Sequence, residues 1–219
     1  MPWLGYFDKM DKCDVFVFLD NIQYKKNEYQ NRNRIKTSQG WQWLTVPTNY
    51  RFPQKISEVT IDSTTDWRKK HLHAIEFNYG KSPYFNKYID VFRELYGLDR
   101  LLLSDINMAC VRMLRDLLGV GTELLVSSET GISCGEPNLR LIELCRKLGA
   151  DTYLAGRDGK NYMDLEMFRA AGITVRFQEF NHPVYPQLFG NFEYYMSAID
   201  LLFNCGNNSI RILRGEGTL

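Results

Sequence analysis

The chain has 219 residues, of which 44% are hydrophobic and 24% are charged, and its formal net charge is +1. This length and composition are typical of a globular protein with a sizeable core, and we expect one domain over residues 1–219. The near-neutral charge gives no global electrostatic reason to expect a nucleic-acid partner or an anionic membrane surface.

The five cysteines include no pair at C-x-x-C spacing, so the sequence predicts neither a disulfide framework nor a zinc site. No apolar stretch is long enough to span a bilayer, and the start lacks a basic segment followed by an apolar run. We therefore expect a cytoplasmic protein with no metal site and no membrane span.

In the first half of the chain, a short helix is expected over residues 4–11. The run from Asp14 to Asp20 is nearly continuously apolar, which is typical of a strand buried on both faces. Residues 41–46 alternate aromatic, polar and apolar side chains between Gly40 and Pro47, so they predict a second strand. A third predicted strand and three consecutive predicted helices follow, at residues 56–61, 66–79, 84–96 and 104–118.

In the second half, apolar strand patterns alternate with helical patterns. The predicted strands are 123–127, 151–155 and 173–180, and the predicted helices are 137–148, 164–171 and about 193–204. This alternation favours an α/β fold of Rossmann-like type, with a mostly parallel sheet and helices on both faces. The helices between residues 66 and 118 would form an insertion.

The first candidate site is the donor-rich run from Asn31 to Lys36, which we expect to be a loop leading into the 41–46 strand. Guanidinium and amide groups hold phosphate or carboxylate well, so Arg32, Asn33 and Arg34 are candidate anion ligands. Trp43 would pack on a sugar or a base. The simpler alternative is a solvated loop before an ordinary strand.

The second candidate is the glycine-containing loop after the 151–155 strand. Gly156 and Gly159 permit tight turns, Lys160 supplies a cation, and Tyr162 offers a ring just before the next predicted helix. The spacing differs from that of a Walker motif, and an ordinary strand-to-helix turn is the alternative.

His182 is the candidate general base, because its pKa lies near neutrality and it is expected in a loop after a strand. Asp20, at the end of a buried strand, is a second candidate for that role. His71 and His73 lie on different helix faces, so a metal pair is not expected, although His71 could face a site. A thiol hydrolase using Cys134 with His182 is a further alternative.

The polar patch made by Asp20, Gln23 and Tyr24 could bind hydroxyl groups of a sugar or ribose. Tyr185 and Gln187 lie in the same predicted loop as His182 and complete the set of candidate binding residues.

Several runs of the sequence resemble the WbqC-like protein family: PWLGYFDKM, DVFVFLDNIQY, NRNRIKTSQGWQWLTVP, YLAGRDGKNYMD and HPVYPQ, with Phe192, Ser197 and Asp200 near the end. The resemblance covers almost the whole chain and carries these positions over: Asp20, Gln23, Asn33, Arg34, Trp43, Gly156, Gly159, Lys160, Tyr162, His182, Tyr185 and Gln187. Members of that family usually begin with a strand and a polar turn ahead of the PWLGYF run, so we expect the first strand either to be missing here or to lie upstream of an alternative start.

The resemblance implies a role in bacterial surface-polysaccharide biosynthesis, such as that of O-antigen, but no settled reaction. We expect a transferase that moves an acyl, aminoacyl or nucleotidyl group to a sugar, with a small-molecule substrate that is phosphorylated or nucleotide-linked. A nucleotide or sugar nucleotide is the expected ligand class. A non-catalytic binding or scaffold protein of the same pathway is the alternative, and the sequence leaves the oligomeric state open.

Overall fold

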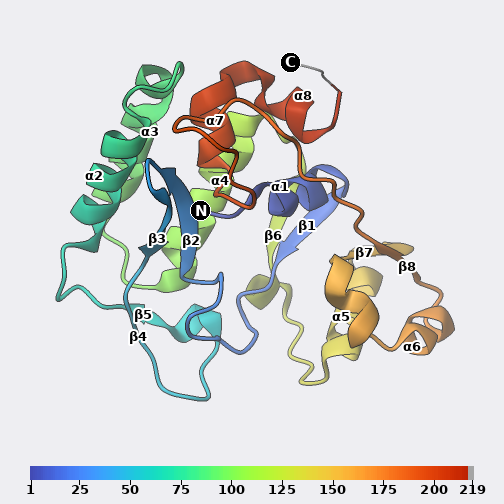
Figure 1. Cartoon of the computed structure of the whole chain (residues 1–219). Helices are drawn as coiled ribbons and strands as arrows, with labels where there is room; N and C mark the ends of the chain where they lie inside the picture. Colours follow the sequence, from blue (N-terminus) through green and yellow to red (C-terminus); the bar gives the residue numbers. More distant parts are fainter. Residues whose placement is uncertain (217–219) are drawn as a thin grey trace. The chain divides into compact units, whose positions relative to one another are not determined.

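A computed structural model describes residues 1–216 of the chain (Figure 1). Their contacts divide the chain into two compact units. The first, which we call the hairpin unit, comprises Met1–Asp8, Asp20–Gly121 and the residues from His182 onward. The second, the α/β unit, comprises Lys9–Leu19 and Thr122–Asn181. Helix α1 (Leu4–Asp11) contains residues of both.

The α/β unit contains two pairs of parallel strands. β1 (Val15–Phe18) pairs with β6 (Glu123–Val126), and β7 (Thr152–Ala155) pairs with β8 (Thr174–Phe177). The chain passes from β7 to β8 through the 3₁₀ turn η3 (Arg157–Asn161) and helix α6 (Leu165–Ala170), as parallel pairing requires a crossover.

A small hydrophobic core packs against the second parallel pair of this unit, β7 and β8. Helix α5 (Pro137–Lys147) buries Ile142 and Cys145 against Phe168 of α6 and Ile173 ahead of β8. Asp164 begins α6 as its N-cap, accepting hydrogen bonds from the backbone N–H groups of Glu166 and Met167. The described strands are hydrogen-bonded in pairs, so the expectation of one mostly parallel sheet is wrong, whereas the mixed α/β content and the parallel pairing are confirmed.

The hairpin unit is named for the antiparallel pair β2 (Arg32–Thr37) and β3 (Gly40–Thr45). The run expected as a loop before a single strand is therefore itself a strand. Two features support the hairpin: Gly40 adopts a φ of 107° at the turn, and Ile35 is fully buried on the inner face. A shorter antiparallel pair, β4 (Thr48–Asn49) and β5 (Thr60–Ile61), follows.

Three helices of this unit confirm the consecutive helices predicted between residues 66 and 118: α2 (Trp67–Tyr79), α3 (Phe85–Gly97) and α4 (Leu103–Leu118). The unit also contains α7 (Ile199–Cys205) and α8 (Ser209–Leu213). All seven residues of α7 are buried. Its Phe203 stacks on Tyr79 of α2 with ring centroids 5.2 Å apart and lies 5.1 Å from Phe92 of α3. Aromatic packing thus joins three helices in one core.

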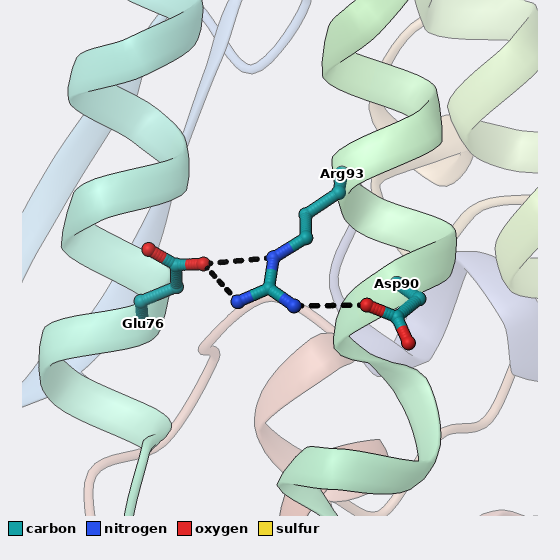
Figure 2. Close-up of polar contacts among 3 residues, drawn as sticks. All are labelled: Glu76, Asp90 and Arg93. Atoms are coloured by element: carbon teal, nitrogen blue, oxygen red, sulfur yellow. Dashed lines mark hydrogen bonds and ion pairs between the residues drawn. The ribbon is translucent and has the colours of Figure 1, made fainter.

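An exposed ion pair also joins α2 and α3 (Figure 2). The Arg93 guanidinium donates to Glu76 Oε1 from Nε at 3.0 Å and from Nη2 at 2.6 Å, and to Asp90 Oδ1 from Nη1 at 2.8 Å. Because the side chains are largely solvent-exposed, we expect this pair to contribute little to stability.

Two local expectations are wrong. Residues 56–61 form the 3₁₀ turn η1 (Ile56–Glu58) before β5, not one strand. The terminal helix begins at Ile199 rather than near residue 193, since Tyr195 has a φ of 63°, which a helix excludes. Among residues 1–216, no helix has the length and apolar character needed to cross a bilayer.

Candidate functional site

Cations and aromatic rings cover one face of the β2–β3 hairpin, which we call the Arg/Trp face. It comprises Tyr29, Arg32, Arg34, Trp41 and Trp43. The Arg32 guanidinium lies 4.3 Å from the Trp43 ring centroid, and the Arg34 guanidinium lies 4.9 Å from that of Trp41 and 5.9 Å from that of Trp43. Strand register explains the arrangement, because Arg34 pairs directly with Trp43 across the ladder.

The rings of this face also contact one another and reach solvent. Trp41 and Trp43 pack edge to face at 5.5 Å, and Tyr29 lies 5.9 Å from Trp43. Trp41 is 41% exposed and Tyr29 is 59% exposed. The face is therefore a preformed aromatic surface that a ligand ring can reach.

The cations of β2 differ in their partners. Arg32 donates from Nη2 to the carbonyl of Asn27. Within residues 1–216, the Arg34 guanidinium has no hydrogen-bond or ion-pair partner, and its Nε is buried without one. A guanidinium that is fixed by two indoles and lacks a counter-ion is suited to bind an anion.

A cavity of about 40 Å³ lies among β2, α2, α3 and α4, and its lining includes residues that the sequence singled out, Asn33 and His71. The cavity shares Tyr29 and Arg32 with the Arg/Trp face. Two of its lining residues, Asn31 and Trp67, each carry a buried polar atom without a partner, Oδ1 and Nε1 respectively.

His71 is held as a neutral ring in the wall of this cavity. Its Nε2 lies 3.0 Å from the carbonyl oxygen of Thr45, and its Nδ1 lies 3.4 Å from the Tyr96 hydroxyl. Thr45 accepts, so Nε2 carries the proton. Burial lowers the pKa of His71 to about 4, mainly by desolvation. His73, two residues on, is exposed, as the helical spacing indicates.

The third cation of β2, Lys36, is buried in a polar cluster around Asp200. Lys36 is 2% exposed; its ammonium donates to Gln187 Oε1 at 3.0 Å and to the Asn191 carbonyl. Asp200, fully buried on α7, accepts at Oδ2 from Tyr185 at 2.9 Å and from Gln187 at 2.7 Å. Tyr185 and Gln187, expected as ligand-binding residues, thus lie together.

Sequence reasoning did not select Lys36, Tyr79 or Asp200 as site residues. Desolvation lowers the pKa of Lys36 and raises the pKa of Asp200. The negative charge of Asp200 partly offsets the shift of Lys36, and the positive charge of Lys36 partly offsets the shift of Asp200. Asp200 was visible only as part of the family resemblance, and no local pattern indicated that Lys36 would be buried.

His182 lies in a cage of aromatic rings, with Tyr194 and Tyr195 each at 5.4 Å and Phe192 at 5.9 Å between centroids. Its Nδ1 lies 2.8 Å from the Pro183 carbonyl, and its Nε2 accepts from the backbone N–H of Tyr195 at 3.2 Å. Both ring nitrogens are therefore engaged in this conformation, and desolvation lowers the pKa. A role for His182 as base would require this hydrogen bond to Tyr195 to open.

The patch at Asp20 is tied into local structure. Asp20 is buried, and its backbone carbonyl accepts from Ser57 at 2.8 Å. The Tyr24 hydroxyl lies 3.1 Å from Thr48 Oγ1, and Gln23 donates to the carbonyls of Tyr24 and Gln54. These side chains order the β4 region, and a ligand role for them stays a prediction.

The loop with Gly156 and Lys160 belongs to the α/β unit, where it forms η3. A Cβ on Gly159 would lie 2.9 Å from Met163 Sδ, so close packing explains that glycine. The Lys160 ammonium lies 5.3 Å from the Phe177 ring centroid, and Tyr162 is 71% exposed. An anion-binding role for this loop stays a prediction, and it is independent of the one for the Arg/Trp face.

Cys134, also in the α/β unit, is half-buried, and its thiol lies 3.7 Å from the Glu136 carbonyl. The thiol-hydrolase alternative stays a prediction that Cys134→Ser would test. Within the described chain no group of three His, Cys, Asp or Glu side chains has the arrangement of a metal site.

Comparison with known proteins identifies relatives of the whole chain. The family model described as "WbqC-like protein family" matches residues 1–212. The curated "Uncharacterized protein Rv1507c" of Mycobacterium tuberculosis (strain ATCC 25618 / H37Rv) is 38% identical over 218 residues, which cover 98% of this chain and 94% of that protein. No solved structure matches the chain. The extent of both matches shows that this chain belongs to the WbqC-like protein family.

Proposed function

We propose that this protein binds an anionic sugar derivative, phosphorylated or nucleotide-linked, at the Arg/Trp face. In this proposal it acts as an enzyme of bacterial surface-polysaccharide biosynthesis, transferring an acyl, aminoacyl or nucleotidyl group to the sugar. The observation that carries the proposal is the Arg34 guanidinium, which lies against Trp41 and Trp43 and has no anionic partner among residues 1–216.

The chemistry of the face matches the two parts of such a ligand. A guanidinium offers a planar fork of donors that fits phosphate or carboxylate, so Arg34 and Arg32 would hold the anionic group. Rings that reach solvent offer stacking area to a sugar or base, and Trp41 and Tyr29 do so. The indoles fix the guanidinium before the ligand arrives, which lowers the entropy lost on binding.

A non-catalytic binding protein of the same pathway is the second candidate. The observation that favours it is the state of His182, whose ring nitrogens both have partners within the loop. A base needs a free nitrogen within hydrogen-bond reach of the proton that it removes. The two candidates share the same ligand site and differ in turnover.

Binding is tested by isothermal titration with UDP-glucose, UDP-N-acetylglucosamine, ADP-glucose and glucose 1-phosphate. We expect one class to bind, and Arg34→Ala to weaken that binding about 10- to 100-fold, because it removes charge-assisted hydrogen bonds. Arg34→Lys should recover part of the affinity, since it keeps the charge without the fork. Arg112→Ala is the matched control, because Arg112 is exposed on α4 and outside the face.

Equal affinity of wild type and Arg34→Ala would refute the site. For a sugar ligand that binds, incubation with the purified protein and a group donor (an acyl-CoA, an aminoacyl thioester or a nucleoside triphosphate) then separates the two candidates, because the bound sugar is the acceptor and the donor releases CoA, the thiol or pyrophosphate. Formation of a modified sugar that requires Arg34 supports the enzyme, whereas binding without turnover supports the non-catalytic protein.

A further inference from the structure

We infer that the cavity lined by Asn31, Trp67 and His71 is a subsite for a neutral group that both donates and accepts hydrogen bonds, such as the amide of an N-acylamino substituent. This inference deepens the proposed function, on which it rests, by naming the feature of the sugar that the protein selects. It starts from the polar atoms that the fold leaves without partners.

Those atoms are one donor and one acceptor. Trp67 is 3% exposed and its indole Nε1–H has no acceptor; Asn31 is 6% exposed and its Oδ1 has no donor. The Nδ2 atom of Asn31 does have a partner, since it donates to the Val46 carbonyl at 2.9 Å. Leaving a buried donor or acceptor without a hydrogen bond is unfavourable, so a group that completes both atoms would gain from binding there.

The lining disfavours a cation, and its two unpartnered atoms favour a group that both donates and accepts. None of the lining residues is acidic, and the lining includes Arg32 and the amino-terminal Met1, so an ammonium group would be repelled there. His71 stays neutral near pH 7, because burial lowers its pKa to about 4. A carboxylate could accept from Trp67, but it has no proton for Asn31 Oδ1. An amide supplies both a carbonyl oxygen and an N–H, and it carries no charge to desolvate.

The size and the remaining walls suit a short acyl chain. The cavity of about 40 Å³ has room for a few water-sized groups. The lining also includes apolar side chains that would contact a methyl group: Ile35, Leu44, Leu95 and Ile106. Tyr29 and Arg32 belong both to the cavity lining and to the Arg/Trp face, so the inference places the connection between the anion site and the substituent site at these two residues.

The first experiment needs no knowledge of the full ligand. The chain has four tryptophans, so the ¹⁵N-labelled protein gives four indole N–H signals in a two-dimensional NMR spectrum. Trp67→Phe assigns the Trp67 signal by its disappearance and keeps an aromatic ring in the core. We expect N-methylacetamide to shift that signal saturably. Acetate and methylammonium at equal concentration should leave it unchanged.

A Trp67 signal that does not move up to about 100 mM N-methylacetamide, or that moves equally with acetate, would overturn the inference and leave a cavity filled by water. This readout uses the wild-type protein, so it holds even if Trp67→Phe is poorly folded. In that case Trp3→Phe, Trp41→Phe and Trp43→Phe assign the signal by elimination.

The second experiment joins the subsite to the face. We expect UDP-N-acetylglucosamine to bind wild type at least about 10-fold more tightly than UDP-glucose, which offers a hydroxyl at the same position. Trp67→Phe should bring this ratio close to one, whereas Arg34→Ala should weaken both ligands equally. Binding of both ligands with a ratio of one in wild type would refute the subsite alone. Failure of Arg34→Ala to weaken either ligand would refute the proposed function instead.

Discussion

The Tyr79 hydroxyl donates a 2.9 Å hydrogen bond to Oδ1 of Asp200, and both side chains are buried in the hairpin unit. The same hydroxyl accepts from the backbone N–H of Lys36 at 3.1 Å, so it connects a strand of the hairpin with helix α7. Burial beside the Asp200 carboxylate raises the pKa of Tyr79 well above its usual value, which keeps the phenol protonated as a donor.

Removing the Tyr79 hydroxyl should destabilise the protein more than removing the Tyr185 hydroxyl, which donates to Oδ2 of Asp200. In Tyr79→Phe, Oδ1 of Asp200 and the N–H of Lys36 both lose their partner, at a cost of about 1–3 kcal/mol. In Tyr185→Phe, Oδ2 of Asp200 keeps the 2.7 Å hydrogen bond from Gln187, so the cost should be smaller. Urea unfolding of both variants measures the difference, and equal or reversed losses would contradict this account.

The buried charges of Lys36 and Asp200 should be energetically coupled. Lys36→Met leaves a buried carboxylate, and Asp200→Asn leaves a buried ammonium, so each single variant should lose about 3 kcal/mol of unfolding free energy. The double variant removes both charges and should lose at least about 1 kcal/mol less than the sum of the two single losses.

The double-mutant cycle from urea unfolding measures this coupling. Lys87→Met is the control partner, since Lys87 is exposed and contacts Asn207 rather than Asp200. Additive losses for Lys36 and Asp200 would mean that their pKa shifts arise from burial alone.

The consecutive helices were predictable because local signals define them. α2 begins after Asp66, whose carboxylate accepts from the N–H of Lys69, and α4 ends at Gly119, which adopts the left-handed conformation. Their apolar residues recur at helical spacing, and that spacing is what the core requires. These features lie within a few residues of each other, so the sequence alone exposes them.

Strand β2 was not predictable in the same way. Its cations suggest a solvated loop, yet Arg32 and Arg34 lie over tryptophan rings of β3 instead of in water. Lys36 can be buried because its ammonium donates hydrogen bonds to Gln187 and Asn191, which lie about 150 residues away along the chain. No local pattern carries such a long-range contact.

The donor-rich composition of β2 nevertheless pointed to a plausible anion site. The aromatic stacking of Arg34, and the cavity on the side where Asn33 and Ile35 are buried, depend on the pairing of β2 with β3. Composition therefore indicated which residues to consider, while tertiary structure decides which of them can meet a ligand.

A methyl group at Gly206 should be costly, because the position is both crowded and left-handed. The residue has a φ of 57°, and a Cβ there would lie 2.4 Å from the ring of Tyr84. Gly206→Ala should therefore lower the unfolding free energy by about 2 kcal/mol or more, through strain and overpacking. Gly97→Ala is the control: no atom lies within 4 Å of that Cβ, and alanine favours the helix by about 0.5–1 kcal/mol. Thermal unfolding that ranks the two variants the other way would refute the packing argument.

The buried His71 should make the stability of the protein fall at mildly acidic pH. Its pKa is lowered to about 4 in the folded chain from 6.5 in the unfolded chain, so between these values the unfolded state binds more protons. The contribution is therefore fully present above pH 6.5 and is lost as the pH falls towards 4. A difference of about 2.5 pH units corresponds to a loss of about 3 kcal/mol.

His71→Gln isolates this effect, since glutamine can still donate to the Thr45 carbonyl but does not titrate. Other acidic groups affect wild type and variant alike, so the measurement is the difference between their urea unfolding free energies at pH 7, 5.5 and 4.5. We expect wild type to lose stability relative to His71→Gln across this range. A constant difference would mean that the imidazole is solvated when protonated, and it would remove the argument that His71 stays uncharged in the wall of the cavity.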